Sequence, residues 1–214
     1  MDNIQLSGPE RAAAAGGDPK HLVLLLHGLG ADGDDLIGLV PLMADLLPHA
    51  HFIAPNAPER CDMSPYGYQW FSLRSWSPQS MLKGAQDAAP KLNLFIDAQL
   101  KRFNLTEDRL ALVGFSQGTM MSLYTALRRP KPCAAVVGFS GALVGEAGVT
   151  SMPPVCLIHG DQDTVVPYGA MGLAEAVLKH EGISVETHTR RGLGHGIDPQ
   201  GIDIATAFLK ARLK

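Results

Sequence analysis

Short apolar runs that alternate with longer amphipathic stretches constrain the fold of this chain more than any other feature. Most of these runs are apolar at successive positions, as expected for strands that helices cover on both faces of a parallel sheet. The sequence therefore predicts an α/β fold, with a mostly parallel, doubly wound sheet and helices on both of its faces. The expected strands are His21–Leu26, Ala50–Ala54, Leu110–Gly114, Ala134–Phe139, Val155–His159 and Val185–Thr189, and the expected helices are Leu36–Leu47, Lys83–Phe103, Gln117–Arg129, Tyr168–Glu181 and Gln200–Lys214.

The length and apolar content of the chain suit one domain. Its 214 residues are 46% hydrophobic, which is enough for one substantial core. We expect residues 21–214 to form that domain and the Ala- and Gly-rich residues 1–20 to be loosely ordered. The chain does not open on a cationic stretch followed by an apolar one, and no apolar run is long enough to cross a bilayer. We therefore expect neither a signal peptide nor an integral membrane segment.

Charge and cysteine content exclude several classes of protein. Charged residues make up 18% of the chain and its net charge is −3, so we expect no basic surface for a nucleic acid. The cysteines, Cys61, Cys133 and Cys156, are too few and too scattered for a disulfide scaffold or a zinc site. Cys133 and Cys156 lie in apolar runs and are expected to be buried, inert thiols. These features predict a protein of a reducing compartment, the cytoplasm.

The pentapeptide GFSQG at residues 114–118 joins an expected strand to an expected helix. It fits the pattern G-x-S-x-G, in which a strained strand-to-helix turn points the serine hydroxyl outward. Glycines two positions either side of the serine prevent collisions where the strand and the helix cross closely. The pentapeptide alone is a weak signal, but its place between strand and helix is the one that the pattern requires. We therefore predict that Ser116 is a nucleophile.

A serine hydroxyl is a weak nucleophile and needs a histidine base. In this kind of fold the acid and then the histidine follow the serine along the chain. His195 lies in a glycine-rich loop after the last expected strand, which is where the base belongs. His27 and His159 lie at strand ends and are expected to hold the backbone through hydrogen bonds. We therefore predict His195 as the base.

Two carboxylates, Asp161 and Asp163, follow the expected strand Val155–His159 and could orient the histidine. The acid must lie far enough along the loop to reach the imidazole beyond the edge of the sheet. Asp161 comes directly after Gly160 and is expected to tie the turn through backbone hydrogen bonds. We predict Asp163 as the acid.

Two backbone N–H groups are expected to form an oxyanion hole. One belongs to Gln117, the residue after the nucleophile at a helix N-terminus, and the other to the loop that follows an early strand. The segment HGLG at residues 27–30 is that loop, and Leu29 is its expected donor.

The same loop suggests a dinucleotide-binding enzyme as an alternative, because residues 28–33 formally match the pattern G-x-G-x-x-G after a strand. Asp32, Asp34 and Asp35 argue against a dinucleotide site, since carboxylates at a helix start would repel a pyrophosphate. No acidic residue ends the second strand, where a ribose contact belongs. The acids do not complete a calcium-binding pattern either, and they are more typical of a helix N-cap.

The segment Cys61–Ser80 is long, aromatic and too apolar for a disordered loop. It follows the strand Ala50–Ala54, whose carboxyl end should lie at the same sheet edge as the nucleophile. We predict that it forms part of an acyl-binding site, with core packing as the alternative and a mixture of the two as a third outcome. The predicted acyl-binding side chains are Trp70, Phe71, Leu73 and Trp76.

Jointly, these motifs resemble the carboxylesterase / acyl-protein thioesterase family of α/β-hydrolases. The resemblance rests on residues 27–30, 114–118, 159–163 with 166–167, and 194–195, and it spans roughly Val23 to Leu209. It implies hydrolysis of medium to long acyl esters or thioesters, on small molecules or proteins, through a Ser-His-Asp triad and without a cofactor. The Asp32–Asp35 cluster and the sequence YQWF at residues 68–71 differ from the family pattern, and both bear on substrate choice.

Two other functions stay open at this point. A lysophospholipase-type activity would use the same triad on a different leaving group. A non-catalytic binding protein could share the fold, because fold does not fix function, but such a protein would be expected to lose a triad member. The sequence does not specify an oligomeric state and leaves a homodimer open.

Overall fold

Seven strands form one central sheet in the computed structural model, which describes residues 6–145 and 148–214. Their order across the sheet is β1-β3-β2-β6-β7-β8-β9. β1 runs antiparallel to β3, and the other neighbouring pairs are parallel. The predicted α/β architecture is confirmed. The strands of this sheet are β1 (Glu10–Arg11), β2 (His21–Leu26), β3 (Ala50–Ile53), β6 (Leu110–Phe115), β7 (Ala135–Phe139), β8 (Val155–Gly160) and β9 (Val185–Arg190).

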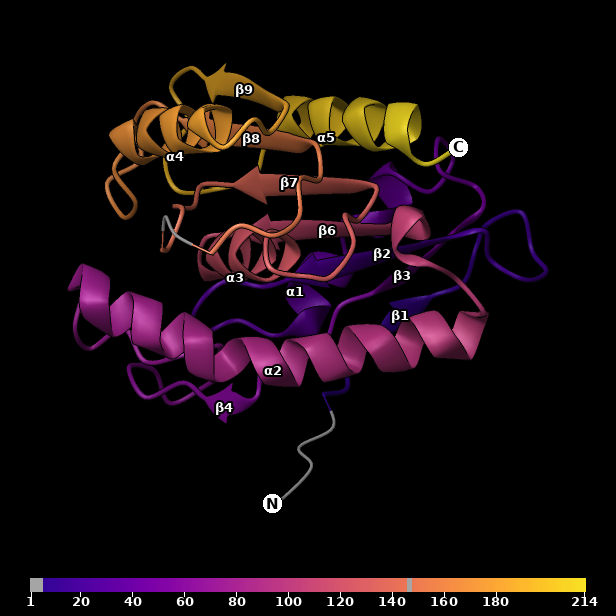
Figure 1. Ribbon diagram of the computed structural model, residues 1–214, viewed down its shortest axis with the longest axis horizontal. Coiled ribbons are helices and arrows are strands. Elements are labelled where there is room, and N and C mark those ends of the chain that lie inside the picture. Colours follow the sequence, from indigo (N-terminus) through magenta and orange to yellow (C-terminus); the bar gives the residue numbers. More distant parts are fainter. Residues whose placement is uncertain (1–5, 146–147) are drawn as a thin grey trace.

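Helices cover both faces of the sheet, as Figure 1 shows. The alternating side chains of β2 divide between two cores, with Leu22 and Leu24 on one face and Val23 and Leu25 on the other. The first core contains buried side chains of α2, α3 and α4, and the second contains those of α1 and α5. All of β2 is buried, which explains its unbroken apolar sequence. The helices are α1 (Gly33–Ile37), α2 (Pro78–Phe103), α3 (Gln117–Ala126), α4 (Gly169–His180) and α5 (Pro199–Arg212).

The predicted helix Leu36–Leu47 is wrong. The structure has the short helix α1 followed by a 3₁₀ turn, η1 (Val40–Leu42). Gly38 ends α1, and Pro41 in the next turn cannot donate a backbone hydrogen bond. The N-cap interpretation of the acidic cluster is confirmed, because the Asp32 carboxylate accepts hydrogen bonds from the backbone N–H groups of Asp34 and Asp35.

Helix α2 begins five residues before its predicted start and passes through Pro90 without ending. Its first turn is capped by Ser77, whose hydroxyl accepts a hydrogen bond from the N–H of Ser80, and Pro78 occupies the first helical position. One face of α2 is buried along its length, and this packing offsets the hydrogen bond that Pro90 cannot make. In Figure 1, α2 runs along much of the long axis of the molecule.

The N-terminal segment adds an edge strand to the central sheet. β1 pairs with β3 at the sheet edge, with Glu10 opposite Ile53, and the side chains of Leu6 and Ala13 are buried. Residues 6–20 therefore contribute a strand and buried side chains to the domain, and residues 1–5 of the segment expected to be loosely ordered lie outside the described residues. A second small sheet, unpredicted, pairs β4 (Glu59–Arg60) with β5 (Tyr68–Gln69) inside the aromatic segment.

Two cysteines are buried in the core of the sheet. The predicted burial of Cys133 and Cys156 is confirmed, and it raises the pKa of each thiol to about 12, which disfavours the reactive thiolate. Among the described residues, no helix is both long and apolar enough to cross a membrane.

Candidate active site

Ser116 occupies the turn between β6 and α3, at the carboxyl edge of the sheet. Its backbone has φ 54° and ψ −115°, a positive-φ conformation that is strained for a residue with a Cβ atom. The flanking glycines permit the close crossing that the sequence predicts. A Cβ atom on Gly118 would lie 1.8 Å from the carbonyl oxygen of Leu26, and one on Gly114 would lie 2.4 Å from the backbone of Gly118. The turn therefore has the geometry of a nucleophile elbow.

Asp163 and His195 are brought together from two separate loops. The Asp163 Oδ2 atom lies 2.8 Å from Nδ1 of His195, and Oδ1 accepts hydrogen bonds from the N–H groups of Val165 and Val166, both at 2.9 Å. Burial opposes ionisation of this carboxyl, but the hydrogen bonds from His195 and the two backbone groups outweigh it and lower its pKa. Asp163 is therefore held as a carboxylate that can orient the imidazole.

A third side chain, His159, contacts the same carboxylate. Its Nε2 atom lies 3.2 Å from Asp163 Oδ2 and 2.9 Å from the carbonyl oxygen of Val166. Because a carbonyl only accepts, Nε2 of His159 carries a proton and points it at both oxygens. The backbone role predicted for His159 is confirmed, whereas its contact with Asp163 was missed. The four-residue spacing of the two side chains around a strand end was the available signal.

The loop that carries His195 is fixed at both ends. The Asp161 carboxylate accepts a hydrogen bond of 2.7 Å from the N–H of Gly192, and its own N–H donates to the carbonyl oxygen of Arg190 at 3.1 Å, so Asp161 ties this loop to the end of β8. After His195, Asp198 caps α5 and forms a 2.8 Å ion pair with Arg190. These contacts keep the imidazole at the sheet edge.

His195 also lies beside the nucleophile elbow. Its ring is 4.9 Å, centroid to centroid, from the ring of Phe115, the residue before Ser116. Within the described residues, no hydrogen bond joins the Ser116 hydroxyl to His195. Such bonds are often long or poorly aligned without a substrate and shorten in the Michaelis complex.

The expected oxyanion donors flank Ser116. Gln117 is the first residue of α3, where helix geometry leaves the N–H group without an intrahelical partner. The β2–α1 loop reaches the serine from the other side, because a Cβ atom on Gly28 would lie 3.4 Å from Cβ of Ser116. Leu29, the second expected donor, follows directly and is partly buried.

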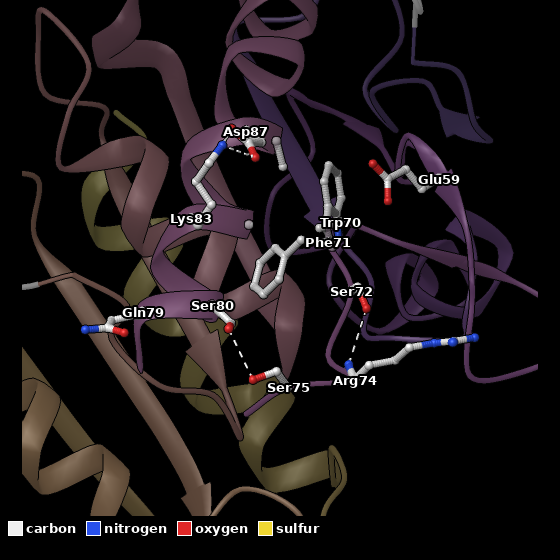
Figure 2. A pocket seen from close by; sticks show the side chains of 12 residues that line it. Glu59, Trp70, Phe71, Ser72, Arg74, Ser75, Gln79, Ser80, Lys83 and Asp87 are labelled. Atoms are coloured by element: carbon white, nitrogen blue, oxygen red, sulfur yellow. Dashed lines mark hydrogen bonds and ion pairs between the residues drawn. The ribbon is translucent and has the colours of Figure 1, made fainter. Parts of the chain in front are cut away.

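The aromatic segment is partly buried and partly exposed. Trp70, Phe71 and Leu73 are buried in the core, whereas the side chain of Trp76 is about half exposed. Figure 2 shows Trp70 and Phe71 beside the first turns of α2, where they line a cleft of about 560 Å³. Neither Ser116 nor another triad candidate lines this cleft. Acyl binding by the four side chains stays a prediction, to which Trp76 offers the most free surface.

Comparisons with known proteins agree with this geometry. Residues 10–213 match the protein family described as Phospholipase/Carboxylesterase. Acyl-protein thioesterase 1 homolog 1 of Dictyostelium discoideum is 30% identical over 207 residues, which cover 89% of this chain and 90% of that protein. Acyl-protein thioesterase 1 of Eremothecium gossypii is 30% identical over 230 residues, covering 98% and 95%. The crystal structure of esterase PE8 is 44% identical and superposes with a TM-score of 0.93, covering 98% of this chain and 100% of that one.

Proposed function

Because this chain belongs to the phospholipase/carboxylesterase family and is therefore an ester or thioester hydrolase, we propose that it cleaves acyl esters and thioesters through Ser116, His195 and Asp163. The observation that carries the proposal is the 2.8 Å contact between Asp163 and His195, beside a serine held on a strained turn. The names of the thioesterase relatives support the thioester part of the proposal.

In the first half of the reaction, Nε2 of His195 takes the hydroxyl proton of Ser116 as Oγ attacks the acyl carbonyl. The Asp163 carboxylate keeps the Nδ1–H tautomer of the imidazole and stabilises the imidazolium. The N–H groups of Leu29 and Gln117 stabilise the negative oxygen of the tetrahedral intermediate. Collapse of the intermediate expels the alcohol or thiol, which receives the proton from His195.

In the second half, His195 takes a proton from water, and the resulting hydroxide attacks the acyl-Ser116 ester. A second tetrahedral intermediate forms in the same oxyanion hole and collapses to release the carboxylic acid. His195 returns the proton to Ser116 Oγ, which restores the enzyme. No step needs a metal or an organic cofactor.

A fluorophosphonate probe tests this proposal directly, because it phosphonylates a serine only where a base and an oxyanion hole activate that serine. We expect one probe adduct per chain, located on Ser116 by peptide mass spectrometry. An unlabelled protein, or a label on another serine, would contradict the assignment.

The leaving group is tested by comparing p-nitrophenyl octanoate, an octanoyl thioester and a lysophospholipid at equal concentration. We expect the first two to be cleaved at higher kcat/KM. Preferential cleavage of the lysophospholipid would favour the lysophospholipase alternative.

A cytoplasmic location, inferred from the scattered cysteines, is part of the proposal.

A further inference from the structure

The segment at residues 67–71 contacts both elements that carry the expected oxyanion donors. Toward the β2–α1 loop, the N–H of Gly30 donates to the carbonyl oxygen of Tyr68. In return, the N–H of Tyr68 donates to the carbonyl oxygen of Ala31, and both distances are 2.8 Å. The approach is close, since a Cβ atom on Gly67 would lie 2.0 Å from the Gly30 carbonyl oxygen. This side of the segment thus pairs with the loop that holds Leu29.

Toward α3, the same segment is held by the side chain of Gln117. The amide oxygen of Gln117 accepts a 2.9 Å hydrogen bond from the N–H of Trp70, and its Nε2 atom donates a 2.7 Å bond to the carbonyl oxygen of Phe71. The residue is fully buried, so water cannot replace either bond. The residue whose backbone N–H is the expected oxyanion donor thus also binds the segment with its side chain.

The indole of Trp70 makes a third connection. Its Nε1–H group donates a 3.0 Å hydrogen bond to the carbonyl oxygen of His27, and only 1% of Trp70 is exposed. The ring of His27 is fixed in turn, because its Nε2 atom accepts the N–H of Ala57 at 3.0 Å and Nδ1 donates to the carbonyl oxygen of Gly28 at 2.7 Å. The Trp70 indole therefore holds the backbone two residues before Leu29.

We propose that the side chains of Gln117 and Trp70 act as a brace that sets the spacing between the two oxyanion donors. Both are positioning residues, since they act through the backbone of Leu29 and Gln117 and not on the substrate. The proposal rests on the proposed function above. It gives Trp70 a role different from the acyl binding predicted from the sequence.

The physical reason is the precision that an oxyanion hole requires. Its donors must lie within about 0.5 Å of the productive position. A displacement of about 1 Å can cost on the order of 10²-fold in rate. The two donors lie on elements separated by more than eighty residues of sequence, and the loop at residues 28–31 contains two glycines that do not restrain it. Buried hydrogen bonds from one rigid segment to both elements supply that restraint.

The test uses the full chain and two substitutions that remove the hydrogen bonds of the brace and keep an apolar side chain at each position. Trp70→Phe removes the indole N–H, and Gln117→Met removes both side-chain hydrogen bonds. Thr206→Val is the matched control, because it removes one buried hydrogen bond, 2.8 Å from the Thr206 hydroxyl to the Ile202 carbonyl, inside α5. The readouts are Tm, the separate values of kcat and KM for p-nitrophenyl butyrate, and inhibition by a trifluoromethyl ketone, whose adduct places an oxyanion in the hole.

We expect each brace variant to lose between about 10- and 10²-fold in kcat with little change in KM, and to bind the trifluoromethyl ketone more weakly by a similar factor. Thr206→Val should lower Tm but keep kcat. A kcat loss in the brace variants no larger than in Thr206→Val, or a change in KM alone, would overturn the proposal. If fluorophosphonate fails to label Ser116 in the unsubstituted protein, the proposed function itself fails. Normal labelling with unaffected brace variants refutes only the brace.

Discussion

Single residues at the carboxyl edge of the sheet have separable tasks, although two histidines share the carboxylate of Asp163. Asp163 accepts from His195 and lies near His159, whereas the neighbouring carboxylate of Asp161 binds the backbone of Gly192. Two acids in one short turn are thus assigned to different roles by the atoms that each one contacts. Substitutions that conserve shape separate these roles.

Replacing Ser116 with alanine should abolish turnover, because no other group at the elbow can form the acyl-enzyme. We expect kcat to fall on the order of 10⁴–10⁶-fold while the cooperative thermal transition persists. Ser122→Ala, in the helix that follows Ser116, is the matched control: among the described residues the buried Ser122 hydroxyl has no hydrogen-bond partner, so its removal leaves nothing unpaired. Substantial activity in a folded Ser116→Ala protein would exclude Ser116 as the nucleophile.

Asp163→Asn should reduce kcat by about 10⁴-fold, because the asparagine amide favours the wrong tautomer of His195. Asp161→Asn should have a far smaller effect, since an asparagine oxygen can still accept the N–H of Gly192. Steady-state kinetics on the two purified variants, with circular dichroism to verify folding, makes the comparison. The assignment of the acid is wrong if the Asp161 variant loses more activity.

At the scale of elements, the crossing of β2, β6 and α3 determines where the Ser116 side chain points. Gly118→Ala should disrupt this crossing, because the added Cβ atom would overlap the Leu26 carbonyl oxygen. We expect loss of both activity and thermal stability. Gly172→Ala in α4 is the control, since a Cβ atom there meets no described atom within 4 Å and should stabilise the helix by about 0.5–1 kcal/mol. Similar Tm values for the two variants would show that the crossing tolerates a side chain.

The aromatic segment contributes both to the core and to the surface, so its residues should respond differently to truncation. Leu73→Ala should cost about 2–5 kcal/mol of stability, because Leu73 is buried, and an equal loss of activity on all esters would remove Leu73 from the predicted acyl site. Trp76→Ala should instead flatten the rise of kcat/KM with acyl length. In an apolar groove, each added methylene of the substrate can contribute up to ~0.8 kcal/mol of binding free energy. Activities on p-nitrophenyl esters from acetate to decanoate measure both. An unchanged length profile in Trp76→Ala would place the acyl groove elsewhere.

These elements also show what local sequence patterns can predict. The buried strands β2, β6, β7 and β8 were predicted within a residue or two, because short runs that are apolar at every position are typical of strands covered on both faces. The short strands β1, β4 and β5 were missed because their two-residue ladders are set by tertiary contacts and not by periodicity. For the same reason the burial of Trp70 against Gln117 and His27 was not predicted. Hydrogen bonds between segments distant in sequence leave no periodic signal.

At the scale of the whole molecule, neutral buried histidines link stability to pH. His27 is fully buried, and burial lowers its pKa below the ordinary value of 6.5. Protonation would place a hydrogen on Nε2, which already accepts the N–H of Ala57. Burial likewise lowers the pKa of His21. The unfolded chain therefore binds protons that the native protein excludes once the pH falls below about 6.5.

The carboxylates respond at lower pH. A hydrogen bond from Arg102 lowers the pKa of Glu10 to about 2, and the pKa of Asp163 is also below its usual range. Such groups stabilise the native state above their unfolded pKa values, about 4, and this stabilisation is lost as the pH falls through the lower native values. Acid destabilisation should therefore occur in two steps, with the histidines preceding the carboxylates.

Urea unfolding between pH 8 and pH 3 tests this order. Stability should be nearly constant above pH 7 and then decline by up to about 1.4 kcal/mol per pH unit for each buried histidine that the native state keeps neutral. His27→Gln should make the decline between pH 6.5 and pH 5 shallower, even though it lowers stability at pH 8. His180→Gln is the control, because it replaces an exposed histidine at the end of α4. An identical slope in the His27 variant and the unsubstituted protein would show that His27 does not couple folding to pH.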